Sequence, residues 1–347
     1  TNDRVPCIFI ENGRGVNLDP NDPLYVSYKE NFPGEPTGKD NPELLRMLPS
    51  VGHAGAIVNG VPRIGFQKGG KTAQWKDEDM AELFLEKAKG FMKKNKDKPF
   101  FLYYGLHQPH VPRVPNERFA GKSGMGPRGD VILEADWCVT EFLKEMDKLG
   151  LTENTLVVFT SDNGPVLDDG YQDQAVELVG DHKMAGPLRG GKTSLYDGGT
   201  CIPFMLRWPA KVKPQVSDVF VCQMDLLASF ASLLGQTYPD KVDSENTLDA
   251  FLGKSKKEVV QPYYYVQFDN HATGYRGLRT STHTFAVHAT NGKIDETVLY
   301  DRTKDPYQMD NIAGQSPRLV RQFNKQLKAW LLHTNDSFAH YLETVTK

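Results

Sequence analysis

The first candidate chemistry lies in a loop that carries two histidines. In the stretch GLHQPHVPRVP, His107 and His110 are three residues apart, and Arg113 follows closely. The prolines fix φ and limit the freedom of the loop, which suits a site that must hold an imidazole in place. An imidazole held in this way could donate a proton. The alternative is a rigid surface turn whose histidines have no function.

A second candidate follows an apolar run in the stretch FTSDNGP, where Asp162 stands beside Asn163. A carboxylate next to a carboxamide oxygen is a pair of hard oxygen donors, which is the chemistry that Ca²⁺ or Mg²⁺ prefers. A two-zinc phosphatase would favour a histidine beside the aspartate, and Asn163 supplies none. The pair therefore favours calcium, and the alternative is an ordinary Asn-Gly turn.

A third candidate, the stretch GPLRGGKT at residues 186–193, fits the spacing of a phosphate-binding P-loop. A P-loop must leave a buried strand and open a helix. Here the preceding ELVGDHKMA is polar, Gly198 and Gly199 would stop a helix early, and Pro187 lacks a backbone donor. We therefore reject the P-loop and retain Lys192, a compact charge suited to a tetrahedral oxyanion. The alternative for Lys192 is a solvated loop lysine.

The elements that position these loops can be read from apolar runs and helical periodicity. Residues 1–72 show little sustained period and predict irregular loops with short strands. Helices are expected from residue 77 to a lysine-rich end and over 130–149, and buried strands at 99–106 and 155–160. A further strand is expected at 201–209 and a further helix at 222–235. The alternation predicts an α/β fold with a large, mostly parallel sheet flanked by helices, and functional residues beyond its strand ends.

Both long helices show a predicted core stripe. In the first, the stripe comprises Met80, Leu83, Phe84, Ala88 and Phe91. In the second, it comprises Ile132, Ala135, Val139, Phe142, Leu143 and Met146.

The pattern of apolar and turn residues changes after about residue 255. PYYYVQF, YRGLRT, HTFAVHA and TVLYD are short strand-like runs separated by turn residues, and a last helix follows near PRLVRQFNKQLKAWLLH. This pattern predicts a smaller antiparallel sheet plus helix. We therefore expect a catalytic α/β domain over 1–255 and a C-terminal α+β subdomain over 256–347.

Composition excludes several classes of protein. The 347 residues carry a formal net charge of −3, which provides no field for binding nucleic acid. No apolar run approaches the ~20 residues of a membrane span, and the first residues lack the layout of a signal peptide. The four cysteines are widely separated without a C-x-x-C pair, which argues against a zinc knuckle or a redox motif.

The ordered set LHQPHVP, FTSDNG, GPLRGGKTSLYDGGTCIPFMLRWP and LYDRTKDPYQMDNIAG resembles a type I sulfatase of the arylsulfatase kind, in the alkaline phosphatase superfamily. The resemblance implies that Asp162 and Asn163 are two ligands of a calcium ion. It also implies that His110 and Lys192 contact the sulfate. His107, Arg113 and His182 match positions where substrate or leaving-group contacts are expected.

The sequence departs from the family at its nucleophile. The family uses a formylglycine made from the first residue of Cys/Ser-x-Pro-x-Arg, and these 347 residues contain no such motif; CIPFM at Cys201 has Met205 in place of the arginine. The paired N-terminal aspartates of the calcium site and the GKWHLG motif are also missing. We therefore expect the C-terminal part of a longer sulfatase, which needs its N-terminal segment to complete the fold. The part alone should be inactive and should expose apolar surface.

The resemblance implies hydrolysis of sulfate monoesters on sulfated carbohydrates or aryl sulfates, in a periplasmic, secreted or lysosomal location. One alternative is a phosphatase, phosphodiesterase or phosphonate hydrolase of the same superfamily, and another is an inactive, glycan-binding relative. The stretch YYYVQFDNHATGYRG could line a carbohydrate subsite with His271 as a contact, although a half-buried, tyrosine-rich strand is the simpler interpretation.

Overall fold

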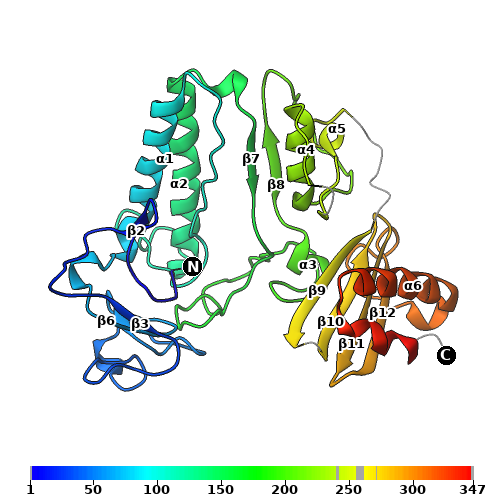
Figure 1. Ribbon diagram of the computed structural model, residues 1–347, viewed down its shortest axis with the longest axis horizontal. Coiled ribbons are helices and arrows are strands. Elements are labelled where there is room, and N and C mark those ends of the chain that lie inside the picture. The colour runs from blue at the N-terminus through cyan, green and yellow to red at the C-terminus, as the bar shows by residue number, and fades with distance from the viewer. Residues whose placement is uncertain (1, 240–241, 255–261, 271, 345–347) are drawn as a thin grey trace. The chain divides into compact units, whose positions relative to one another are not determined.

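The computed structural model describes residues 2–239, 242–254, 262–270 and 272–344 (Figure 1). It forms two compact units, each with its own core. The first unit comprises residues 1–152 and 167–182, and the second comprises residues 153–166 and 183–347. The predicted domain boundary near residue 255 adjoins residues 255–261, which lie outside the described ranges, so it stays a prediction.

The N-terminal part of the first unit consists of short antiparallel strand pairs, as its irregular sequence predicts. These are β1 (Ile10–Glu11) with β2 (Arg14–Gly15), β3 (Tyr25–Ser27) with β6 (Phe66–Lys68), and β4 (Ile57–Val58) with β5 (Val61–Pro62). The fully buried Arg63 links them to the next element, because its two terminal nitrogens donate to Asp77 at 3.0 and 2.7 Å. A paired buried charge of this kind fixes a region that has few ladder hydrogen bonds.

Two long helices, α1 (Met80–Asn95) and α2 (Gly126–Lys148), pack side by side in the first unit (Figure 1). The helix predictions are confirmed, but the predicted core stripes are partly wrong. In α1, Leu83, Phe84 and Phe91 are each 37% exposed, while Leu85 and Met92 are buried. In α2, only Met146 of the predicted stripe is buried, and Ile132 is 39% exposed. Both helices are apolar on more than one face, so periodicity alone does not decide which face packs.

The apolar run 99–106 is not a strand in this structure. It is irregular, and Phe101 and Tyr103 are 74% and 84% exposed. The prediction of a buried strand here is therefore wrong for the structure as described. A strand requires a neighbour to accept its backbone hydrogen bonds, and no strand described here pairs with this run.

The run 155–160 does form a strand, β7 (Val157–Thr160), in the second unit. It pairs antiparallel with β8 (Phe204–Arg207) in a two-stranded sheet, and Phe159 and Met205 remain 38% and 57% exposed. Among the described strands every ladder is antiparallel, and the parallel contact between Arg4 and Ile64 is an isolated bridge. The prediction of a large, mostly parallel sheet is thus wrong for the described part of this chain. The apolar runs were recognised from the sequence, but the strands that would pair with them in parallel are not among those described.

Three short helices are described in the second unit before its C-terminal sheet, namely α3 (Asp197–Thr200), α4 (Leu226–Leu233) and α5 (Leu248–Phe251). The second of them, α4, confirms the helix expected at 222–235. α4 and α5 contact each other, and the buried Ser229 of α4 accepts a hydrogen bond from the backbone of Thr247 at 3.0 Å.

The C-terminal sheet confirms the predicted antiparallel subdomain. Its strands are β9 (Tyr263–Asn270), β10 (Thr273–Arg279), β11 (His283–Thr290) and β12 (Lys293–Asp301), each paired with the next. The helix α6 (Pro317–His333) packs on one face, against a core that includes Phe285, Val287 and Leu327 (Figure 1). The alternate residues Ala286, Val298 and Tyr300 face the other side, where they pack with Leu195 and Tyr196. The period of two along β11 therefore separates two cores.

Candidate active site

The loop with the two histidines is anchored by its arginine. Arg113 is 2% exposed and donates to Asp173 at 2.8 Å, to the Leu167 carbonyl at 2.9 Å and to the Pro109 carbonyl at 3.1 Å. These bonds tie the loop to the segment that begins at Leu167, within the first unit. A guanidinium buried in this way holds the loop in place, and the substrate contact expected of Arg113 stays a prediction.

His110 is the more accessible of the two imidazoles. Its Nδ1 lies 2.8 Å from the Val111 carbonyl, its Nε2 lies 3.9 Å from Asp169, and its side chain is 30% exposed. The carbonyl favours a proton on Nδ1, so Nε2 is the nitrogen left to face a ligand, and it donates to an anion or a leaving oxygen only when it also carries a proton. Sequence reasoning missed Asp169, although the run Asp168–Asp169–Gly170, which begins five residues after Asn163, was a signal for a turn rich in charge.

Sequence reasoning also missed a histidine, His53, which lies near Asp169. The Nε2 of His53 is 3.3 Å from Asp3 and its Nδ1 is 2.5 Å from the Val51 carbonyl. Burial alone would lower the pKa of His53, but the bond to Asp3, with Asp169 nearby, raises it. A Cβ on Gly170 would lie 2.0 Å from Nδ1, so only glycine leaves room for this ring. The carboxylates of this region thus favour positive charge on the imidazole of His53.

His107 has a different environment. Burial lowers the pKa of His107 to about 4, with a smaller opposing effect of Asp77. Its ring faces Phe84, with 6.4 Å between the ring centroids. His107 is therefore neutral at physiological pH and is poorly suited to attract a sulfate by charge.

In the second unit, Asp162 and Asn163 follow β7, as the sequence predicts. Asp162 is exposed, and its Oδ1 accepts the backbone N–H of Asn163 at 2.9 Å. The amide nitrogen of Asn163 donates to the Gly164 carbonyl at 2.9 Å, which leaves the amide oxygen as the acceptor side of the group. Two hard oxygen donors in adjacent positions fit Ca²⁺. Within the described ranges no group of three or more His, Cys, Asp or Glu could hold a metal.

The lysine loop is bonded directly to the Asp162–Asn163 loop. The backbone N–H of Lys192 donates to the Pro165 carbonyl at 2.8 Å, and the N–H of Gly164 donates to the Gly199 carbonyl at 2.9 Å. A Cβ on Gly164 would lie 1.9 Å from the Gly198 carbonyl oxygen, so the two backbones approach as closely as glycine permits. The structure therefore brings a cationic residue and two potential metal ligands onto adjoining loops.

The geometry of the lysine loop agrees with the rejection of a P-loop. No strand precedes it between Lys183 and Gly191, and α3 begins only at Asp197 and spans four residues. Gly190 has φ of 82° and Thr193 has φ of 70°, values that belong to turns.

The remaining predicted contacts, where they fall in the described ranges, are described each within its own unit. His182 is exposed, and its backbone N–H donates to the Val179 carbonyl at 3.2 Å. His271 lies outside the described residues. His110 belongs to the first unit and Lys192 to the second, and each is placed within its own unit.

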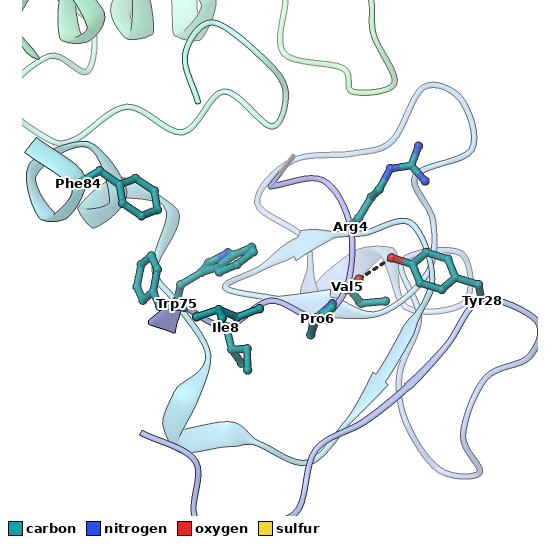
Figure 2. A pocket seen from close by; sticks show the side chains of 9 residues that line it. Arg4, Val5, Pro6, Ile8, Tyr28, Trp75 and Phe84 are labelled. Carbon is teal, nitrogen blue, oxygen red and sulfur yellow. Dashed lines mark hydrogen bonds between the residues drawn. The ribbon is translucent and has the colours of Figure 1, made fainter. Parts of the chain in front are cut away.

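A pocket of about 430 Å³ opens in the first unit, and none of the predicted site residues lines it (Figure 2). Its walls include the aromatic rings of Tyr28, Trp75 and Phe84, and the Tyr28 hydroxyl donates to the Val5 carbonyl. The indole nitrogen of Trp75 is buried without a hydrogen-bond partner. The pocket is thus mainly an apolar feature of the N-terminal strand region.

None of the described helices combines the length and the apolar character needed to cross a membrane.

Comparison with known proteins identifies the family. The model of the family described as Sulfatase matches residues 21–236, and that described as N-sulphoglucosamine sulphohydrolase, C-terminal, matches residues 191–336. The N-acetylgalactosamine-6-O-sulfatase of Bacteroides thetaiotaomicron is 47% identical over 337 residues, which cover 95% of this chain and 66% of that protein. Human arylsulfatase A is 32% identical over 255 residues, which cover 67% of this chain and 48% of that enzyme. The chain therefore spans between about half and two thirds of the length of these relatives.

Solved structures with similar folds support the same family. A protein whose structure comes from work on the metabolism of multiple glycosaminoglycans by Bacteroides thetaiotaomicron superposes with a TM-score of 0.88 at 46% identity, covering 95% of this chain and 70% of that one. A putative sulfatase from Bacteroides fragilis superposes with a TM-score of 0.60 at 33% identity, covering 81% of this chain and 63% of that one. The chain has a sulfatase-like fold and belongs to the sulfatase family.

Proposed function

We propose that the protein hydrolyses sulfate monoesters on sulfated carbohydrates, and that its substrate is a 6-O-sulfated N-acetylgalactosamine or a closely related glycosaminoglycan sugar. The support for the substrate is the 47% identity to a protein named for that activity. The support for the chemistry is the backbone bonding of the Lys192 loop to the Asp162–Asn163 loop. A cation and two hard oxygen donors on adjoining loops suit a divalent oxyanion bound next to a metal ion.

In this proposal the chain's own residues bind and orient the sulfate. Asp162 and Asn163 would hold a calcium ion, which when bound supplies positive charge at the sulfate oxygens. Lys192 neutralises charge on the same group, and its loop is fixed before substrate arrives, which is the condition for electrostatic stabilisation of a transition state. His110 contributes Nε2 as a contact to the sulfate or to the leaving oxygen.

The remaining predicted residues take different roles. Arg113 positions the His110 loop through its bonds to Asp173 and Leu167. His107 is neutral and packs its ring against Phe84 instead of contacting the sulfate by charge. His182 and His271 remain proposed substrate contacts that await a test.

We also propose that the nucleophile and further calcium ligands come from sequence outside these 347 residues. The absence of Cys/Ser-x-Pro-x-Arg from the chain and the 66% coverage of the Bacteroides relative support this proposal. The apolar run 99–106, which no described strand pairs, and the exposed side chains of Phe159 in β7 and Met205 in β8 are surfaces that such a segment would cover, and it would supply the neighbours of a larger sheet. By resemblance to the family, we place the complete protein in the periplasm, outside the cell or in a lysosome.

Sulfate release by the complete protein is the direct test. We expect release from N-acetylgalactosamine 6-sulfate that exceeds release from the 4-sulfate by at least ~10²-fold, since specific hydrogen bonds discriminate strongly between positions. Treatment with a calcium chelator should abolish release, and added Ca²⁺ should restore it while Zn²⁺ should not.

Other outcomes would identify the rivals. Release of phosphate with two bound zinc ions would indicate a phosphatase, phosphodiesterase or phosphonate hydrolase. Binding of sulfated sugars without release by the complete protein would indicate an inactive, glycan-binding protein.

A further inference from the structure

A buried carboxylate at the start of α3 is held by three side chains from the C-terminal sheet and the loop after it. The side chain of Asp197 is 6% exposed. Arg279 Nε lies 3.2 Å from its Oδ1, and Arg302 lies 3.1 and 3.2 Å from its Oδ2 through Nη2 and Nε. Gln308 donates to Oδ1 at 3.2 Å and accepts the backbone N–H of Asp197 at 2.7 Å. We call these four residues the Asp197 cluster.

The partners in the cluster are themselves fixed. Arg279 donates to the Leu195 carbonyl at 2.9 Å, and Arg302 donates to the Thr280 carbonyl at 2.8 Å. Gln308 is fully buried and has φ of 58°, a left-handed conformation that is uncommon for a residue other than glycine. Backbone of this kind persists only where the surroundings over-determine it, and such positions concentrate near functional sites.

The cluster connects to both candidate site loops through backbone contacts. Next to Asp197, the N–H of Gly198 donates to the Arg189 carbonyl at 2.8 Å, at the start of the lysine loop. One residue further, the Gly199 carbonyl accepts the N–H of Gly164, the neighbour of Asn163.

Close packing makes these contacts rigid. A Cβ on Gly198 would lie 2.4 Å from the Gly190 carbonyl oxygen, and one on Gly199 would lie 2.5 Å from that of Gly191. A displacement of Asp197 would therefore move the backbone on which Lys192 sits.

The start of the lysine loop, at Arg189, also contacts the cluster directly. Arg189 donates to the Gln308 carbonyl at 2.8 Å, and its guanidinium lies over the ring of Tyr196 at 3.8 Å from the centroid. The segment from Arg189 to Asp197 is thus closed onto Gln308 from both sides. Gln308 lies in the stretch DPYQMDN, for which the sequence suggested no physical role.

We propose that the Asp197 cluster positions Lys192 and the Asp162–Asn163 pair, so that the C-terminal sheet sets how tightly the site binds sulfate and calcium. The inference rests on the proposed function, because it assigns a role to residues around that site. None of the four side chains is assigned a contact with the sulfate; they act through the backbone of the two loops. Outer residues that orient a binding site typically contribute 10- to 100-fold to affinity or activity, about what we expect here.

A second arginine of the same sheet, paired with a partly buried aspartate, provides a matched control. Arg276 is 3% exposed, bonds Asp336 at 2.7 Å and lies over the ring of Phe338 at 4.9 Å from the centroid. It joins β10 to the residues after α6, and its hydrogen bonds and ring contact involve neither site loop. A substitution at Arg276 therefore measures the cost of disturbing an Arg–Asp pair in this sheet without displacing the site.

The test compares Arg302→Lys with Arg276→Lys in the complete protein. Binding of Ca²⁺ alone and of inorganic sulfate is measured by calorimetry, thermal stability by the unfolding midpoint, and turnover on N-acetylgalactosamine 6-sulfate. We expect Arg302→Lys to weaken calcium and sulfate binding by about 10- to 100-fold and to lower kcat, since lysine cannot make the forked bond to Asp197. Arg276→Lys should lower the midpoint similarly but leave both affinities within about twofold of wild type.

Equal affinities in the two variants would overturn the inference. If Arg302→Lys fails to fold, Gln308→Asn, which keeps both arginines and shortens the amide by one methylene, must show the loss of affinity instead; wild-type affinities in that variant would also overturn it. If the complete protein binds calcium and sulfate but releases no sulfate from any sugar, the proposed function fails while the two affinities still decide the inference. Failure of wild type to bind either ion would refute both.

Discussion

The two loops proposed to contact sulfate are fixed by different means. The His110 loop depends on a side chain, because the buried Arg113 joins it to Asp173 sixty residues away. The Lys192 loop is held through its backbone, which bonds Pro165 and packs against glycines; the charged residues Arg189 and the Asp197 cluster act on it through that backbone.

The difference predicts how each loop fails. A side-chain anchor concentrates stability in one ion pair whose desolvation must be offset, so its loss costs folding free energy. A backbone anchor spreads its contribution over many small contacts, so a change there alters geometry first. We therefore expect substitutions around His110 to appear mainly as lost stability and those around Lys192 mainly as lost activity.

The largest effect on stability is expected for Arg113→Ala. Removing the guanidinium leaves the Asp173 carboxylate buried and unpaired, which should lower the free energy of unfolding by about 3–5 kcal/mol. Urea unfolding of the complete protein measures this change. The control, Arg118→Ala, removes an exposed arginine that pairs with Glu82 at 3.2 Å and should cost about 1 kcal/mol or less. Equal losses in the two variants would show that the pair does not anchor the loop.

Lys192→Ala should have the opposite profile. The loss of one preorganised charge at a developing oxyanion should reduce turnover of the complete protein by about 10²- to 10³-fold, while the free energy of unfolding changes by less than about 0.5 kcal/mol. Sulfate release and urea unfolding are measured on the same preparation. Lys183→Ala, which removes an exposed lysine from the same segment, should leave both unchanged. Normal turnover in Lys192→Ala would refute the assignment of this residue.

A smaller but more specific effect is expected from a single methyl group at the backbone contact. In Gly164→Ala the new Cβ meets the Gly198 carbonyl oxygen, which must move by about an ångström to reach an ordinary contact distance. We expect weaker calcium binding and lower turnover, by about tenfold each. Gly314→Ala, where nothing lies within 4 Å of the added carbon, is the control and should behave as wild type. Wild-type calcium affinity in Gly164→Ala would mean that the loops adjust independently.

The sequence could predict those parts of the fold and site that are encoded within a short stretch of residues. The C-terminal sheet was predictable because HTFAVHA alternates between two faces over a few residues, and both faces are covered in the structure. The loops after the apolar runs were predictable as sites because Asp162, Asn163 and Lys192 carry their chemistry in short stretches. Their bonding to one another was not, since it depends on Gly164 meeting Gly198 across 34 residues of chain.

Partners distant in sequence explain the errors. An apolar run such as 99–106 reports a need for burial but not the strand that would satisfy it, and here none is described. That limit also hid the pairing of Arg113 with the distant Asp173, while the substrate contact that the resemblance implies for Arg113 stays a prediction. The same limit concealed the Asp197 cluster, whose members are spread over more than a hundred residues.

The smallest expected effect is the contribution of His107 to the pH dependence of stability, which tests how firmly the His110 loop is packed. Its pKa in the folded protein is about 4, whereas an unperturbed histidine titrates near 6.5. Between these values the unfolded chain binds more protons than the folded one, so stability should fall as pH drops from 7 toward 4, by on the order of 1–2 kcal/mol at pH 5. His107→Gln, which cannot titrate, should lose less stability than wild type between pH 7 and pH 5 in urea unfolding. His182→Gln, at an exposed position, should follow wild type. If His107→Gln also follows wild type, the ring of His107 is solvated, and the His110 loop is less firmly packed than the Arg113 anchor implies.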